Sequence, residues 1–239
     1  MRIHGSKFSL WPRTRSGSDG LEGQGRIRVR GWVVRQAVAL LIVAAWLGEH
    51  PAPSVQAGIA GAEEALSQEA ADSAAAKLRR IEDASIRGRS FGTVRITERE
   101  ANSYLHRELS ASFPPGVSEG RLQFQPDRPI GSAVIDFDRM KEALRAPPHP
   151  IADILLRGVH TLAVEGTLSG AEGTAEFHPE TVMLDGLTLP RPVVEFLIEH
   201  YLKVRYPTVA LDRPFPLPLS IDRVSVEAGS VVLADKPAR

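Results

Sequence analysis

An α+β fold, with an antiparallel sheet packed against two main helices, is the architecture that this sequence predicts. Alternating apolar residues between 130 and 138 and between 159 and 168 are typical of strands with one buried face. A capping box, Thr97 to Glu100, predicts the start of one helix. An apolar segment that begins at Pro190 and ends before Pro207 predicts the second helix.

The N-terminal 57 residues carry an export pattern. Residues 1–30 are polar, rich in Gly, Ser and Arg, and cannot build a core. Four arginines between 26 and 35 precede the apolar run 37–47, and residues with small or medium side chains follow at 54–57. We expect a secretory signal peptide cleaved after Ala57. A retained anchor through 32–48 and a buried core helix are the alternatives, although a span needs about 20 apolar residues. The expected location is the periplasm or cell envelope, and the inner membrane if the anchor is retained.

Charge and composition restrict the function classes. The chain has no cysteine, so disulfides and thiolate chemistry are excluded. Residues 1–57 contain eight Lys and Arg against three Asp and Glu, and the rest contain 21 against 26, a formal charge of −5. This acidic body argues against a nucleic-acid partner and weakens electrostatic docking onto anionic lipid headgroups.

Residues 58–90 and residues 91–239 are expected to differ in role. The first range is rich in alanine, and Leu66, Leu78 and Ile81 recur near helical spacing. It predicts a helix that is either a spacer or packed on the edge of the domain. The second range is expected to form a single α+β domain.

Strand signals occupy most of residues 91–189. We expect strands at 91–96, 120–125, 130–138, 159–168 and 174–177, which are separated by glycines and prolines. Residues 140–157, broken by three prolines, predict two short helical turns. Two short strands, 181–184 and 187–189, flank an Asp185-Gly186 turn.

The helix expected at 191–206 is the most apolar of the chain. Its apolar residues cover roughly 240° of the helical wheel, whereas an ordinary surface helix buries a stripe of about 100° or slightly more. The polar side holds only Glu195, Glu199 and Lys203. This helix is therefore either a core element or the wall of a site for a lipid-like ligand. After it, 211–219 is expected to be extended, and 221–233 predicts a hairpin.

The segment Val94 to Leu105 also resembles exported bacterial proteins of the YceB-like group, in which a strand runs into a "[ST]-E-x-E-x-N-x-x-L" helix. The matching positions are Thr97, Glu98, Glu100, Asn102 and Leu105. Those proteins are similar to the TULIP-like lipid-binding superfamily. The resemblance implies a strongly curved half-barrel sheet with an apolar groove beside a long helix, over residues 91–235. It implies no catalytic residue.

Polar constellations give little indication of chemistry. No catalytic or phosphate-binding motif occurs, so no cofactor is expected. His160 and His178 could meet across neighbouring strands, but two histidines without a third ligand make a weak metal site, so no metal is expected. Asp136 and Asp138 share a strand face in the predicted strand, where they would bind a cation, form an acid–base pair or simply face solvent. Glu98 and Glu100 are expected to serve the helix start rather than catalysis.

The sequence therefore favours non-catalytic binding of a lipid or another apolar ligand in the cell envelope. A structural or assembly module that uses helix 191–206 against a protein partner is the alternative, and an enzyme whose site forms only in three dimensions is a third. The candidate lining residues are Tyr104, Leu105, Leu162, Val164, Phe196, Leu197, Tyr201 and Leu202.

Overall fold

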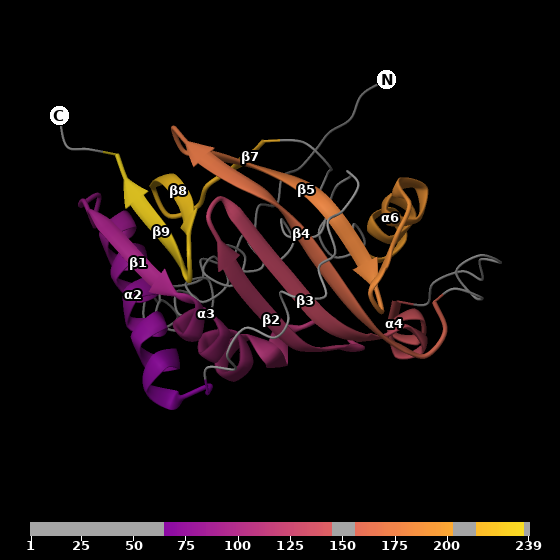
Figure 1. The fold of residues 1–239 in the computed structure, drawn as a ribbon. Coiled ribbons are helices and arrows are strands. Elements are labelled where there is room, and N and C mark those ends of the chain that lie inside the picture. Colours follow the sequence, from indigo (N-terminus) through magenta and orange to yellow (C-terminus); the bar gives the residue numbers. More distant parts are fainter. Residues whose placement is uncertain (1–64, 145–155, 203–213, 237–239) are drawn as a thin grey trace, which may run out of the picture.

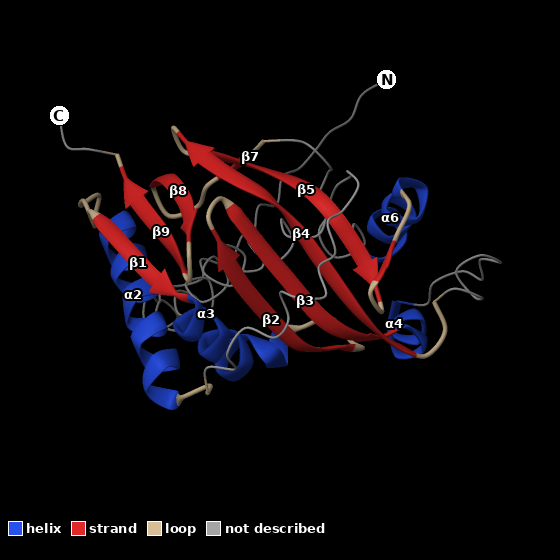
Figure 2. Cartoon of the chain, in the orientation of Figure 1, coloured by secondary structure: helices blue, strands red, loops and turns tan. Residues whose placement is uncertain are grey.

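A computed structural model describes residues 65–144, 156–202 and 214–236 of the chain, with side chains described up to residue 200 in the second range. Within these ranges nine strands form one antiparallel sheet, and the helices lie at its two ends (Figures 1 and 2). The predicted α+β class with an antiparallel sheet is confirmed. The signal segment, its cleavage site, the Pro147–Pro150 turns and residues 203–213 lie outside the described residues.

The elements follow the chain in a regular order. The α-helices are α2 (Gln68–Ile86), α3 (Glu98–Tyr104), α4 (Phe137–Leu144) and α6 (Arg191–Leu197). Helix α3 continues as a π-helical turn, Leu105–Leu109, and a 3₁₀ turn, Ser110–Ser112, and α6 continues as a π-helical turn, Ile198–Leu202. The strands are β1 (Thr93–Thr97), β2 (Val117–Gln125), β3 (Arg128–Asp136), β4 (Val159–Ala171), β5 (Thr174–Leu184), β6 (Leu187–Thr188), β7 (Phe215–Pro216), β8 (Ile221–Glu227) and β9 (Ser230–Asp235). None of the described helices combines the length and the apolarity of a membrane span.

The sheet consists of two groups of strands that are joined by few contacts. The order is β1-β9-β8-β4-β3-β2, and β5 pairs with β4, β6 and β7. Strands β4 and β8 are joined by a single residue pair, Gly170 with Val224. The turn before β9 also reaches the outer strand β2: the N–H of Gly229 donates to the carbonyl of Phe124 at 2.8 Å. These contacts bring the two groups of strands together around a common core.

Helix α2 belongs to that core. Its start is capped by the hydroxyl of Ser67, which accepts from the N–H of Ala70 at 3.1 Å. The buried face consists of Ala70, Ala71, Ala74, Ala75, Leu78 and Ile81. Of the two roles open to the Ala-rich segment, the structure supports packing against the domain, because alanines allow the close approach of α3.

The two helices expected to flank one groove lie apart. Helix α3 packs beside α2, whereas α6 lies at the opposite end of the long strands, the end at which α4 is also drawn (Figure 1). The described part of the predicted helix 191–206 is helical through Leu202. Its residues Val194, Leu197 and Ile198 are buried in the same core cluster as the sheet, which agrees with the core alternative for this segment.

Two boundaries differ from the sequence-based expectation. The separate strands expected at 174–177 and 181–184 form one strand, β5, because a bulge opposite Glu165 and Gly166 accommodates Pro179. The strand expected to reach residue 138 ends at Asp136, and Phe137 begins α4. The backbone N–H of Arg139 donates to the Asp136 carboxylate at 3.0 Å, as at a helix N-terminus.

Candidate apolar binding site

An apolar cavity of about 80 Å³ lies between α2, α3 and the sheet. Ala74, Leu78 and Ile81 of α2 form one wall, and Ala101 and Tyr104 of α3 form a second. The sheet and the loop before β8 supply the rest: Ile96, Leu122, Phe124, Pro129, Leu168, Leu219, Ile221, Val226, Val231 and Leu233. Because every lining side chain except Tyr104 is a hydrocarbon, this space suits an apolar group and does not suit a charged one.

The size of the cavity limits what it can hold. An engineered apolar cavity of about 150 Å³ binds benzene, and pockets for whole drug-sized ligands are about 300–1,000 Å³. A volume near 80 Å³ therefore has room for a few carbon atoms, such as one end of a chain. Tyr104, Ala101 and Leu219 are the half-buried members of the lining, and the others are buried.

Of the eight candidate lining residues, Tyr104 lines this cavity. Leu105, Leu162 and Val164 are almost completely buried in the main core. Leu197 is buried near the other end of the sheet, and half-buried Phe196 stacks on His200 with ring centroids 4.2 Å apart. The side chains of Tyr201 and Leu202 lie outside the described residues.

The contribution of α2 to the cavity was not predicted from the sequence. Ala74, Leu78 and Ile81 share one helical face, and that spacing was visible in the sequence. A stripe of small residues gives a weak hydrophobic signal, because alanine contributes little apolar surface. The role of this face as a cavity wall becomes apparent only from the packing of α3 against α2.

The motif behind the resemblance fixes α3 against the sheet. Thr97 and Glu100 form the predicted capping box, which is confirmed. The side-chain amide of Asn102 forms hydrogen bonds with both backbone groups of Leu122. Its NH₂ group donates to the carbonyl oxygen at 2.8 Å, and its oxygen accepts from the N–H at 2.7 Å. The Glu98 carboxylate accepts from the N–H of Phe124 at 2.8 Å. Helix α3 thus satisfies backbone groups along the outer edge of β2.

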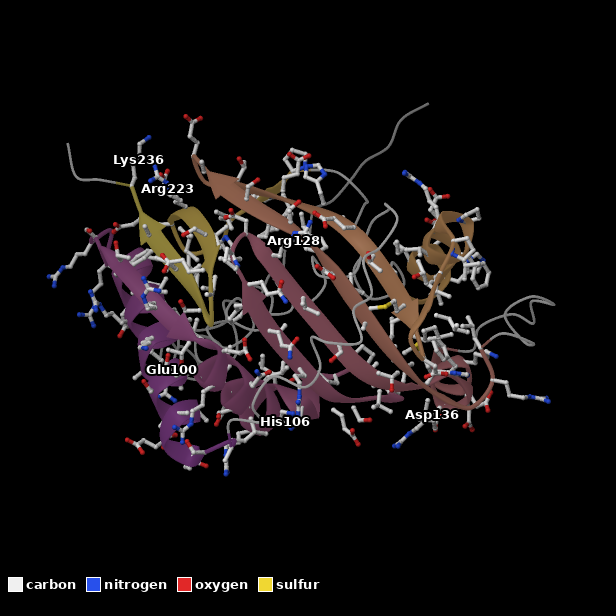
Figure 3. The ribbon with its side chains drawn as sticks, in the orientation of Figure 1. Glu100, His106, Arg128, Asp136, Arg223 and Lys236 are labelled. Atoms are coloured by element: carbon white, nitrogen blue, oxygen red, sulfur yellow. The ribbon has the colours of Figure 1, made fainter. Side chains whose placement is uncertain are left out.

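Glu100, labelled in Figure 3, is the main polar link between α2 and α3, and its chain neighbour Ala101 lines the cavity. Its carboxylate accepts hydrogen bonds from Ser73 at 2.5 Å, from Lys77 at 2.6 and 2.7 Å, and from the N–H of Thr97 at 2.8 Å. Burial opposes its ionisation, but the hydrogen bonds from Lys77, Ser73 and Thr97 outweigh burial and lower the pKa of Glu100. The group is therefore held as a carboxylate and serves to attach α2.

His160 forms a second polar link, at the far end of β4. Its Nδ1 lies 2.6 Å from the Asp185 carboxylate, and its Nε2 lies 2.8 Å from the carbonyl oxygen of Arg157. The hydrogen bond to Asp185 raises the pKa of His160, although burial opposes the rise. Because both neighbours are acceptors, the ring satisfies both only when both nitrogens carry protons. The pair holds the Asp185-Gly186 turn against β4, and neither nitrogen is available as a base.

The other sequence-derived polar constellations do not come together. His178 pairs across the sheet with Thr167 and His160 pairs with Ile135, so the two histidines do not meet across neighbouring strands. Asp136 and Asp138 do not share a strand face, because Asp138 lies in α4 and accepts from the N–H of Gly158 at 2.9 Å. Within the part of the chain that the structure describes, no three potential ligands are grouped to hold a metal ion.

Comparisons of the chain with protein-family models, with curated proteins and with solved structures found no match. The resemblance of residues 94–105 to the YceB-like group therefore stays a prediction, and the functional argument depends on the cavity itself.

Proposed function

We propose that this protein binds an apolar ligand, such as one end of a lipid acyl chain, in the cavity beneath α2. The binding is non-catalytic and takes place in the cell envelope. The observation that carries the proposal is an apolar cavity enclosed by two helices and the sheet. Transfer of each methylene group from water into such a space contributes about 0.8 kcal/mol. Insertion of about three methylenes would therefore contribute about 2.4 kcal/mol to the binding free energy.

Tyr104 supports an amphipathic ligand over a purely apolar one. Its ring lines the cavity while the side chain is only half buried. Tyrosine is suited to such a boundary, because its ring contacts hydrocarbon and its hydroxyl bonds water or a polar headgroup. The ligand class expected is a molecule with a hydrocarbon end and a polar end.

The test is to fill the cavity without disturbing the rest of the helix. Ala74 lines the cavity, whereas Ala76 is exposed on the other side of α2. We expect Ala74→Leu to reduce the binding of dodecanol, measured by titration calorimetry, at least tenfold, and Ala76→Leu to bind as the unchanged protein does. Circular dichroism of both variants checks that they fold. Equal dodecanol binding by the two variants would refute the proposal.

A protein partner is the second candidate, favoured by a separate observation. Val159 and Leu187 are 63% and 73% exposed and lie toward the α4 and α6 end of the sheet. Exposed apolar side chains that form one contiguous patch are typical of an interaction surface. Under this alternative the protein would self-associate in sedimentation experiments, and Leu187→Ser would shift it to the monomer. A monomer that releases lipid on extraction favours the cavity instead.

A further inference from the structure

Positive and negative charges are distributed unevenly over the described residues. Residues 77–95 contain six Lys and Arg against two Asp and Glu, a formal charge of +4. All other described residues contain 10 against 20, a formal charge of −10. The acidic character of the described residues as a whole therefore hides one basic region, formed by the C-terminal half of α2 and the segment that leads into β1 (Figure 1).

Within that region, four arginines accompany one exposed apolar side chain. We call Arg79, Arg80, Ile86, Arg87 and Arg89 the basic end of α2. Ile86 is 53% exposed, and all four arginines are exposed. A helix C-terminus favours nearby cations through its dipole, but the dipole gives no reason to expose an isoleucine.

The turn after α2 fixes the position of two of these arginines. Gly88 has a φ of +60°, which favours glycine, and it separates Arg87 from Arg89. The N–H of Arg87 donates to the carbonyl of Asp83 at 3.1 Å, and the N–H of Arg89 donates to the carbonyl of Ala84 at 2.8 Å. Both side chains therefore leave a closed, hydrogen-bonded turn beside Ile86.

Few acidic groups oppose this charge. Among the described residues, no ion pair involves Arg79, Arg87 or Arg89, and Arg80 donates to the carbonyl oxygen of Phe91 at 2.7 Å. Glu82 and Asp83 of α2 offset two of the positive charges, and Lys77 and Arg95 are paired with Glu100 and Glu227. The remaining formal excess of +2 is carried by the four arginines of the basic end of α2.

Two further cations lie at the same end of the molecule. Arg223 and Lys236 project from the ends of β8 and β9 (Figure 3). Their neighbours Asp222 and Asp235 balance them in charge, so the local excess comes from the basic end of α2.

We infer that the basic end of α2 docks onto the surface of an anionic lipid bilayer. Cationic side chains near such a surface each contribute about 1 kcal/mol, and a neighbouring apolar side chain enters the headgroup region. Charge complementarity identifies the partner as an anionic surface. The rest of the described surface is acidic, so an anionic bilayer would repel it and would attract only the basic end of α2. Docking would place α2, one wall of the apolar cavity, next to lipid, yet it does not depend on the cavity.

The test compares vesicles of phosphatidylcholine with vesicles that contain equal parts of phosphatidylcholine and phosphatidylglycerol, in a sedimentation assay with the full chain. We expect tighter binding to the anionic vesicles and a loss of that difference at high salt. Replacing both Arg87 and Arg89 by Gln should weaken anionic binding about 30-fold, at about 1 kcal/mol for each charge. The control is Arg139→Gln, because Arg139 is exposed and lies on α4 at the opposite end of the molecule. This variant should bind anionic vesicles as tightly as the unchanged protein does.

Any of three results would overturn the inference. The first is equal binding of the unchanged protein to neutral and anionic vesicles, which would mean that hydrophobic insertion alone accounts for the binding. The second is equal anionic binding by the Arg87/Arg89 variant and the Arg139 control. Binding to single-stranded RNA without any preference for anionic vesicles would also contradict it. The dodecanol titration on the same preparations reports separately on the cavity.

Discussion

At the residue scale, three polar side chains of one short helix hold the site together. The capping role of Glu100 was predictable because its partner, Thr97, is three residues away. The contacts of Glu98 with Phe124 and of Asn102 with Leu122 join residues 26 and 20 positions apart. They could not be predicted, because nothing in the sequence says which strand edge lies beside α3.

Replacement of Glu100 by Gln should weaken the attachment of α2 and remove an acid-sensitive part of the stability. The folded-state pKa of Glu100 is lower than its ordinary value of 4.5, so its contribution is present above that value and is lost as the pH falls through the folded-state pKa. We expect a loss of about 2 kcal/mol in the free energy of unfolding at pH 7, because Lys77 loses its charged partner.

Urea unfolding at pH 7 and at pH 3.5 measures both effects. The variant should lose less stability than the unchanged protein between these two values. Glu108→Gln, on an exposed position of the following helical turn, is the control and should change stability by less than about 0.5 kcal/mol. A pH dependence identical in Glu100→Gln and the unchanged protein would show that Glu100 is not the group responsible.

At the element scale, short-range patterns predicted the hairpins but did not predict that a bulge would carry β5 through Pro179. The Asp185-Gly186 turn and the β8–β9 hairpin follow from local turn chemistry and are confirmed. Strands were expected at 174–177 and at 181–184, and the bulge in the pairing of β4 with β5 joins them into one continuous ladder through Pro179. The bulge depends on Gly166 in the partner strand, and that dependence is a matter of tertiary contact rather than of local sequence.

Gly166→Ala should be strongly destabilising. A Cβ at this position would lie 2.4 Å from the carbonyl oxygen of His178 and 2.5 Å from the Cα of Pro179, and both are backbone atoms that cannot rotate away. We expect a loss of about 3 kcal/mol or more in thermal or urea unfolding, as for other overpacked core sites. Gly186→Ala is the comparison. Its Cβ would meet nothing within 4 Å, so its cost should be limited to about 1 kcal/mol for the strain of a positive φ. Equal losses in the two variants would mean that β4 and β5 can move apart at the bulge.

At the scale of the whole molecule, the cavity could not be located from the sequence. Its lining comes from segments between Ala74 and Leu233, most of which are joined only by tertiary packing. The apolar excess of helix 191–206 placed most of the predicted lining away from this cavity, because hydrophobicity measures burial and does not distinguish a filled core from a wall with space beside it.

The position of α2 leads to a prediction about the minimum folding unit. A chain that begins at residue 91 retains every strand, but it lacks Leu78 and Ile81 and uncovers the apolar residues of the sheet beneath them. Loss of those two buried side chains alone costs about 3–6 kcal/mol, at about 1.5–3 kcal/mol each. Because small domains have only about 5–15 kcal/mol of stability, we expect this chain to lose cooperative unfolding in circular dichroism. The matched control begins at residue 65 and keeps α2 together with its Ser67 cap, and it should unfold in a single cooperative transition. Cooperative unfolding of both chains at the same temperature would mean that α2 is an attachment to the sheet domain and not a part of its core.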